Sequence, residues 1–188
     1  MPIVLPAVNF SAELLLKAQG IRAAFFPMCG ALTTRSMHAG VTREASLCCD
    51  GYDRQDINGL QWLQKSGCTP VILLSGNELM PSCFPQSSGI KTVTADSDED
   101  YRSAAESWLD MQGLSWQQAA VMGYDWQDLA LMRRAAVSAA AADAHLEVKT
   151  YADHVGQARS GHGAARSFCD LLLTASGRYA HLLQQYAA

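Results

Sequence analysis

Four turns in this 188-residue sequence carry side chains that can act as nucleophiles or ligands, and each turn follows a short apolar stretch. Cys29 offers a thiol, Ser75 a hydroxyl, and Asp125 and Asp128 offer two carboxylates. A reactive thiolate needs an electropositive setting, and no histidine lies near Cys29 in the sequence, so a packed thiol competes with a functional one. The two aspartates either bind a cation or cap the helix that follows them.

Short apolar runs alternate with amphipathic segments along most of the chain. The runs predict strands at 21–26, 69–74, 90–95, 119–123, 137–142 and 154–156, and the segments predict helices at 12–19, 56–66, 98–112, 129–135 and 162–185. This alternation is typical of an α/β fold with a mainly parallel sheet and helices on both faces. Ligands bind at the carboxyl ends of such strands, which is where we expect the turns 27–30, 75–76, 95–98 and 123–128.

Length and composition favour one compact domain over residues 1–188. Hydrophobic residues make up 49% and charged residues 17%, against roughly 25% charged in an average protein, so part of the surface is expected to be covered in an oligomer. The net charge of −4 disfavours nucleic-acid binding. We find no signal peptide and no apolar run of about 20 residues, so the sequence predicts a cytoplasmic protein with no membrane span.

The same four turns, in this order, resemble the catalytic motifs of the haloacid dehalogenase (HAD) superfamily. The segments 142–145 (Ala-Asp-Ala-His), 152–155 (Ala-Asp-His-Val), 161–166 and 169–173 resemble 3-deoxy-D-manno-octulosonate (KDO) 8-phosphate phosphatases and the C-terminal domain of CMP-sialic acid synthetases. The resemblance implies a HAD-like Rossmannoid three-layer sandwich without a large cap domain. It also implies a small β-hairpin flap at about 31–53.

The resemblance places catalytic groups at positions where this chain lacks them. The family's nucleophilic aspartate, which forms an aspartyl-phosphate, corresponds to Pro27, and its acid/base aspartate corresponds to Cys29. Its lysine falls at Tyr101, and its first metal-binding aspartate of the fourth motif falls at Tyr124. The four positions are degenerate, so we expect no catalytic residue among them, and we expect the family's Mg²⁺ site to be lost. Trp126 is expected to fill the cavity left behind.

Some of the family's binding positions remain. Asp125 and Asp128 are residual acids of the fourth motif, and Ser75 matches the hydroxyl that binds phosphate. Ser75 with Gly76 is a candidate site for a small anion, because a turn at a helix N-terminus presents N–H groups. His162 replaces an arginine in the family's tail, which reaches a neighbouring subunit's active site, so His162 is a third candidate ligand-binding residue.

These observations favour a catalytically degenerate phosphatase homologue, a pseudoenzyme, with a binding or scaffold role in sugar-acid or surface-polysaccharide metabolism. The alternative is an active phosphatase of a phosphorylated sugar acid such as KDO 8-phosphate, and a third possibility is a protein whose site centres on Cys29. We expect no cofactor. The resemblance implies that the partner is the chain itself, as a homotetramer assembled through the flap. Residues 33–49 occupy the place of the flap and have little core of their own, so they are expected to need a partner surface.

Overall fold

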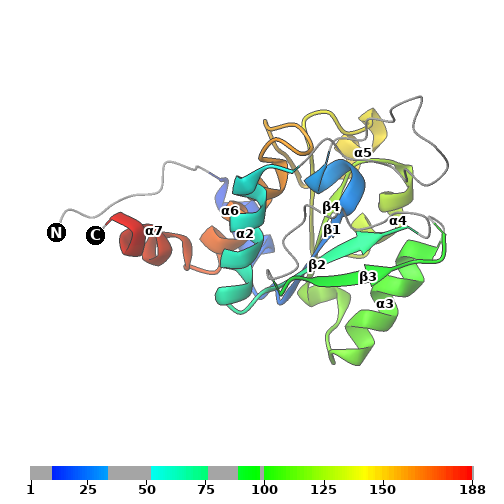
Figure 1. The fold of residues 1–188 in the computed structure, drawn as a ribbon, viewed down its shortest axis with the longest axis horizontal. Coiled ribbons are helices and arrows are strands. Elements are labelled where there is room, and N and C mark those ends of the chain that lie inside the picture. Colours follow the sequence, from blue (N-terminus) through cyan, green and yellow to red (C-terminus); the bar gives the residue numbers. More distant parts are fainter. Residues whose placement is uncertain (1–9, 34–51, 76–88, 98–99, 188) are drawn as a thin grey trace.

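The computed structural model describes residues 10–33, 52–75, 89–97 and 100–187. In this part of the chain six parallel strands form one sheet in the order β3-β2-β1-β4-β5-β6 (Figure 1). The strands are β1 (Ala23–Pro27), β2 (Thr69–Leu74), β3 (Lys91–Thr94), β4 (Ala119–Gly123), β5 (Val137–Ala140) and β6 (His154–Val155). The helices are α1 (Ala12–Lys17), α2 (Arg54–Lys65), α3 (Tyr101–Met111), α4 (Leu129–Met132), α5 (Leu146–Tyr151), α6 (Ala164–Ala175) and α7 (Tyr179–Ala187).

The helices cover the two faces of the sheet, which makes three layers. Helices α2 and α6 lie on one face and α3, α4 and α5 on the other (Figure 1). The central strand β1 shows why: Phe25 packs against Trp108 on one face, while its neighbour Phe26 packs against Phe168 on the other. Alternate residues of a strand face opposite sides, so β1 is buried on both sides and reads as an unbroken apolar run. The predicted α/β sandwich is confirmed.

Local sequence signals set most helix ends. The Ser11 hydroxyl accepts a hydrogen bond from the Leu14 N–H, as the N-cap of α1. Helix α2 begins two residues before the predicted start, because Asp53 caps it by accepting from the Gln55 N–H at 2.8 Å. Asp56, predicted as the opening residue, lies inside the helix and is fully buried.

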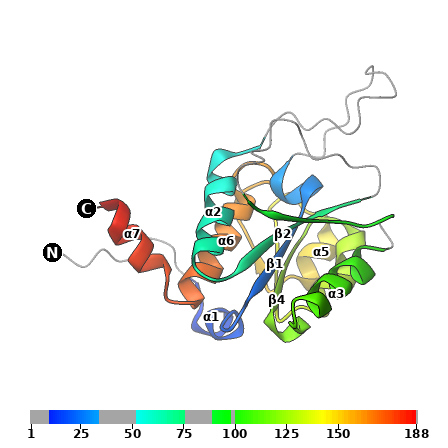
Figure 2. The ribbon, with the colours of Figure 1, turned by 60° about the horizontal axis from the view of Figure 1, so that its bottom comes forward.

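The single helix predicted at 162–185 is wrong. Two helices occupy this stretch, α6 and α7, and Gly177 between them has a φ of +71° that a helix cannot contain. The apolar pattern continues on both sides of the break, which is why periodicity alone did not reveal it. Helix α7 extends away from the sheet (Figure 2), and none of its residues is fully buried.

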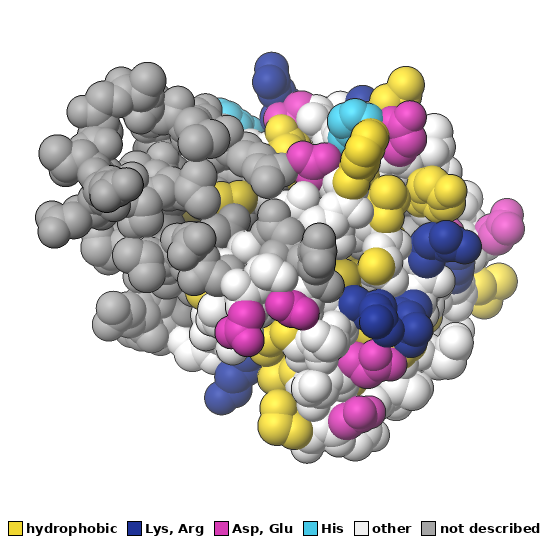
Figure 3. All heavy atoms as spheres, turned by 90° about the vertical axis from the view of Figure 1, so that its right-hand side faces the viewer, with side chains coloured by type: hydrophobic (Ala, Val, Ile, Leu, Met, Phe, Trp, Pro, Cys, Tyr) yellow, Lys and Arg dark blue, Asp and Glu magenta, His cyan; other side chains and the backbone are white. Residues whose placement is uncertain are grey.

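Several expectations concern residues outside the described ranges. Most of the flap at 31–53 lies there, as does Gly76; only residues 31–33 and 52–53 of the flap are described. Among the described residues, no helix is long and apolar enough to cross a bilayer. On the face formed by α3 to α5, acidic and basic side chains are interspersed (Figure 3), and Glu106 pairs there with Arg102 and Arg134.

Candidate functional site

The predicted turns lie at the carboxyl edge of the sheet. Pro27 ends β1 and pairs in register with Leu73 of β2, so Ser75 lies two residues further along the same edge. On the other side of β1, strand β4 ends at Gly123 and runs directly into Tyr124. The sheet therefore brings the first, second and fourth turns side by side, as the parallel topology predicts.

The first turn closes tightly on itself. Residues Met28–Leu32 form a short π-helical turn (η1), interrupted at Cys29 and at Gly30, whose φ is +98°. The Thr33 N–H and hydroxyl both donate to the Met28 carbonyl at 3.1 Å, and the Gly30 N–H donates to the Thr33 carbonyl at 3.1 Å. Thr33 is fully buried, so the loop's polar groups are directed inward to one another.

Tyr124 packs directly against this turn. A Cβ atom added at Gly30 would overlap the Tyr124 ring, so the phenol lies on the glycine backbone itself. The ring also contacts both core clusters of the protein and is half-buried. A bulky ring therefore occupies the space beside the first turn, where the family resemblance places a carboxylate.

Trp126, predicted to fill the cavity, does not do so. Its side chain is 62% exposed, and its indole Nε1 donates to His145 Nδ1 at 3.0 Å on the protein surface. The structure gives the filling role to Tyr124. The physical reason is position: Tyr124, the residue directly after β4, packs on Gly30 of η1, whereas two residues later the chain has entered the 3₁₀ turn Trp126–Asp128 (η5), where the Trp126 side chain is exposed.

The two residual acids act as caps. Asp128 is 1% exposed, and its Oδ2 accepts from the N–H groups of Tyr124 at 2.8 Å and Asp125 at 3.1 Å. The Asp125 side chain accepts from the Trp126 N–H at 2.8 Å and from the Asp128 N–H, and the bond from Asp128 completes a reciprocal capping box. The sequence left two roles open for these aspartates, cation binding and helix capping, and the observed hydrogen bonds are those of helix capping.

The remaining candidates are spread around the edge. Tyr101, at the lysine position, is 1% exposed at the start of α3 and belongs to the core cluster that contains Phe25. Ser75 is half-buried. His162 is exposed, and its Nδ1 lies 2.9 Å from the Ser160 carbonyl oxygen. The adjacent Gly161 N–H donates to the Ala31 carbonyl at 3.2 Å, which brings the His162 segment to the first turn.

A buried carboxylate that the sequence did not single out holds this segment in place. Asp56 of α2 accepts from the backbone N–H groups of Gly163 at 3.2 Å and Arg166 at 2.6 Å, and so caps the start of α6 from another helix. Burial raises the pKa of Asp56 to about 6, and the two hydrogen bonds oppose that rise. The one sequence signal that could have revealed this buried aspartate is its place directly beside Ile57, an apolar position of the predicted helix.

The donor set at the carboxyl edge does not fit a Mg²⁺ ion. That ion requires octahedral oxygen ligands, normally with carboxylates. Pro27 contributes no side-chain donor, Cys29 contributes sulfur, and the Tyr124 ring packs on Gly30. The carboxylates of Asp125 and Asp128 accept backbone hydrogen bonds. In the described ranges no group of three His, Cys, Asp or Glu side chains is arranged to hold a metal.

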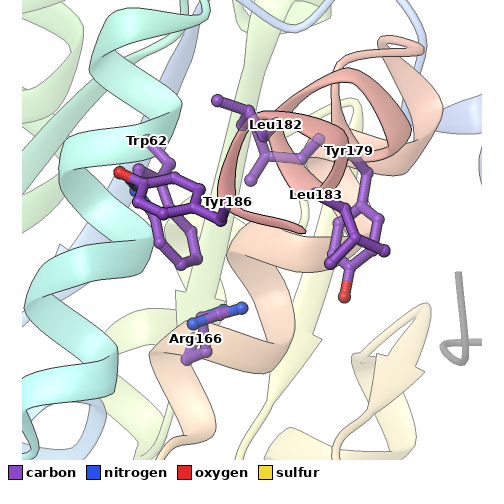
Figure 4. Close-up of a pocket in the computed structure, with 7 residues that line it drawn as sticks. Trp62, Arg166, Tyr179, Leu182, Leu183 and Tyr186 are labelled. Carbon is purple, nitrogen blue, oxygen red and sulfur yellow. Dashed lines mark hydrogen bonds between the residues drawn. The ribbon is translucent and has the colours of Figure 1, made fainter. Parts of the chain in front are cut away.

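One apolar cavity of about 250 Å³ lies away from this edge, between α2, α6 and α7. Trp62, Tyr179, Leu182 and Tyr186 line it, and the Arg166 guanidinium lies 4.3 Å from the centre of the Trp62 ring (Figure 4). The Trp62 indole donates to the Tyr186 hydroxyl at 3.3 Å, which ties α7 to α2. This cavity was not foreseen, because it forms only where three helices meet.

The fold and the carboxyl-edge turns define a HAD-like α/β protein, and its sequence relatives agree. The chain is 26% identical to the KDO 8-phosphate phosphatase KdsC of Escherichia coli over 168 residues, which is 89% of this chain and 87% of that protein. It is also 26% identical to N-acylneuraminate cytidylyltransferase B of Danio rerio over 156 residues. That match covers 82% of this chain but only 36% of the cytidylyltransferase.

Solved structures give the same result. A probable YrbI family phosphatase from Pseudomonas syringae superposes with a TM-score of 0.84 at 27% identity, covering 95% of this chain and 99% of that one. A cobalt-bound KDO 8-phosphate phosphatase from Haemophilus influenzae superposes with a TM-score of 0.78 at 25% identity, covering 92% and 99%. No model of a known protein family matches the chain. The chain therefore has a HAD-like fold and is similar in sequence and structure to KDO 8-phosphate phosphatases.

Proposed function

We propose that this protein is a catalytically degenerate homologue of the KDO 8-phosphate phosphatases that serves as a binding or oligomeric scaffold protein. One observation carries the proposal: the Tyr124 ring packs on Gly30 at the place where the resemblance requires a metal-binding carboxylate. Pro27 and Cys29 add to it, because neither supplies the carboxylate that an aspartyl-phosphate mechanism needs. We therefore expect the rate of phosphate release to be lower than that of an enzyme with these carboxylates, and each factor of ten in that rate corresponds to about 1.4 kcal/mol of activation free energy.

The binding role rests on what the edge retains. The half-buried Ser75 directly follows β2, next to the first turn, and matches the family's phosphate-binding hydroxyl. We propose that a small anion binds there, with Gly76 and His162 as the further candidates, and that the pathway is one of sugar-acid or surface-polysaccharide metabolism. No cofactor is part of this proposal.

The second candidate function is phosphatase activity on a phosphorylated sugar acid such as KDO 8-phosphate. It is favoured by the relatives, since the KdsC match covers most of both chains. Such an activity would need a nucleophile other than the residue at position 27. Cys29, half-buried in the first turn, is the nearest candidate in the sequence.

A phosphate-release assay separates the two functions. With an aryl phosphate and Mg²⁺, we expect release no faster than with the Tyr124→Ala variant, because neither protein contains a nucleophilic carboxylate at the first turn. KDO 8-phosphate should give the same result. Multiple turnovers by the unmodified protein, abolished by Cys29→Ala, would contradict the proposal and establish the second candidate.

The scaffold role predicts a homo-oligomer, and we expect a tetramer. The chain's low content of charged residues, 17%, leaves apolar surface to be covered in an assembly with closed symmetry. Light scattering during size exclusion should give a mass near four times the 20.3 kDa of one chain. A mass near 20.3 kDa at micromolar concentration would refute it.

A further inference from the structure

A second pocket lies at the amino edge of the sheet, opposite the candidate site. It has a volume of about 400 Å³, and residues from the C-terminal ends of α1, α2 and α6 line it. The ribbon in Figure 2 shows where these three helices lie. Apolar side chains, among them Ile21, Leu63 and Leu172, line part of it. Its polar side chains are Arg22, Ser66, Ser176 and Arg178, and none of the described residues that line it is acidic.

The backbone positions of the two arginines explain how both reach this pocket. Arg22 lies between α1 and β1, and its backbone is fixed by two hydrogen bonds, to the Gln118 carbonyl at 2.8 Å and from the Thr69 N–H at 2.7 Å. Arg178 follows the break after α6, where its N–H donates to the Leu173 carbonyl at 2.9 Å. Residues far apart in the sequence therefore approach the same pocket from two sides.

Both guanidinium groups remain available for a ligand. Within the described part of the chain, neither Arg22 nor Arg178 has a side-chain hydrogen bond or an ion pair. The carbonyls at the ends of α2 and α6 already accept backbone hydrogen bonds, for example from Cys68 to Leu63 at 3.1 Å. The chain as a whole carries a net charge of −4, so this concentration of positive charge is a local feature.

The floor of the pocket adds no negative charge. The Cys68 thiol lies there, and burial raises its pKa to about 12, although the charge of Arg22 acts in the opposite direction. The thiol is therefore neutral at pH 7 and does not neutralise the arginine. An anion that enters the pocket meets two arginines, the Ser66 hydroxyl and an apolar wall. The two arginine charges must outweigh the partial negative charge at the three helix C-termini.

We propose that this pocket binds a small phosphate monoester, with Arg22 and Arg178 as ligands of its phosphate group. A planar guanidinium donates two parallel N–H groups to phosphate oxygens, which makes arginine well suited to this ligand. The Ser66 hydroxyl supplies a further donor, whereas the Ser176 hydroxyl already donates to the Leu173 carbonyl at 3.0 Å. The volume of about 400 Å³ exceeds what a phosphate group alone fills and leaves room for an organic body against Ile21 and Leu172.

Isothermal titration of the full chain with glycerol 3-phosphate, in a phosphate-free buffer, tests the proposal. We expect saturable binding, and we expect Arg22→Gln and Arg178→Gln each to raise the Kd by about tenfold, since each removes a charged hydrogen-bonding partner. Lys65→Gln is the matched control: it removes an exposed positive charge at the end of α2, outside the pocket lining. Its Kd should equal that of the unmodified protein.

Two further arms separate this site from the carboxyl-edge site and identify the ligand. Ser75→Ala should remove only a binding step at the carboxyl edge and leave the step that Arg22→Gln and Arg178→Gln weaken. A loss of all saturable binding in Ser75→Ala, with both arginine variants binding normally, would overturn the proposal. Absence of saturation by the unmodified protein would overturn it too. Inorganic phosphate should bind more weakly than the monoester, and equal affinity would contradict contact between the apolar wall and an organic body. The melting temperature of each variant verifies that it is folded.

Discussion

Replacing three residues with aspartate, Pro27→Asp, Cys29→Asp and Tyr124→Asp together, is expected to create a Mg²⁺ site at the carboxyl edge of the sheet. The unmodified protein should bind Mg²⁺ no more tightly than about 1 mM, because sulfur, a proline and an aromatic ring replace the oxygen ligands. The triple variant gains carboxylates and loses the ring that packs on Gly30. Its Kd should fall by at least about tenfold, or about 1.4 kcal/mol, in a calorimetric titration.

The matched control carries asparagine at the same three positions. It has the same side-chain size but no charge, so it should bind Mg²⁺ as weakly as the unmodified protein. Phosphate release should stay absent in the aspartate variant, because position 101 holds a buried tyrosine instead of the family's lysine. Micromolar affinity in the unmodified protein, or equal affinity in the two triple variants, would contradict the degenerate-site proposal.

Asp56→Ala is expected to lower the free energy of unfolding by about 3 kcal/mol at pH 7. The variant leaves the N–H groups of Gly163 and Arg166 without their acceptor at the buried start of α6, and each unsatisfied group costs about 1–3 kcal/mol. Urea unfolding followed by circular dichroism measures the change. Asp53→Ala removes the N-cap of α2, whose acceptor lies near the surface, and should cost only about 1 kcal/mol.

The raised pKa of Asp56 gives a second readout. In the folded protein this carboxyl holds its proton up to a pKa of about 6, whereas in the unfolded chain it titrates near 4. Between these values the folded state binds more protons, so the contribution of Asp56 to stability falls as the pH rises. Two pKa units correspond to about 3 kcal/mol.

The comparison with Asp56→Asn isolates that contribution, because asparagine does not titrate. The difference in unfolding free energy, unmodified protein minus Asp56→Asn, should fall by up to about 3 kcal/mol from pH 4 to pH 7 and then stay level. A difference that is constant over this range would show that the carboxyl of Asp56 has its ordinary pKa in the folded protein.

Local patterns predicted the elements well where the deciding interaction is local. The Ser11 cap accepts from a residue three positions away, and a strand such as β2 is defined by its own apolar run. The same patterns failed at Gly177, where the apolar residues of α6 and α7 form one continuous series although the backbone turns away. Periodicity reports which residues are apolar, and it does not report whether a glycine has left the helical region.

At the candidate site, the sequence by itself determined which chemical groups are missing. The family resemblance defines four catalytic positions, and this chain has no carboxylate or lysine at any of them: they hold Pro27, Cys29, Tyr101 and Tyr124. No fold can change the residue types at these positions. The sequence also determined that the turns share one edge, since strand and helix alternate in the order of a parallel sheet.

Only the tertiary structure decided how the remaining groups are used. Tyr124, and not Trp126, packs on Gly30, and Asp56 caps a helix whose Arg166 is 110 residues away. Arg22 and Arg178 line one pocket because the fold brings together segments that are far apart in the sequence. Each of these contacts joins elements that are distant in the sequence, so it depends on the path of the whole chain through the sheet. Residue type and local spacing contain no information on such distances until the fold brings the partners together.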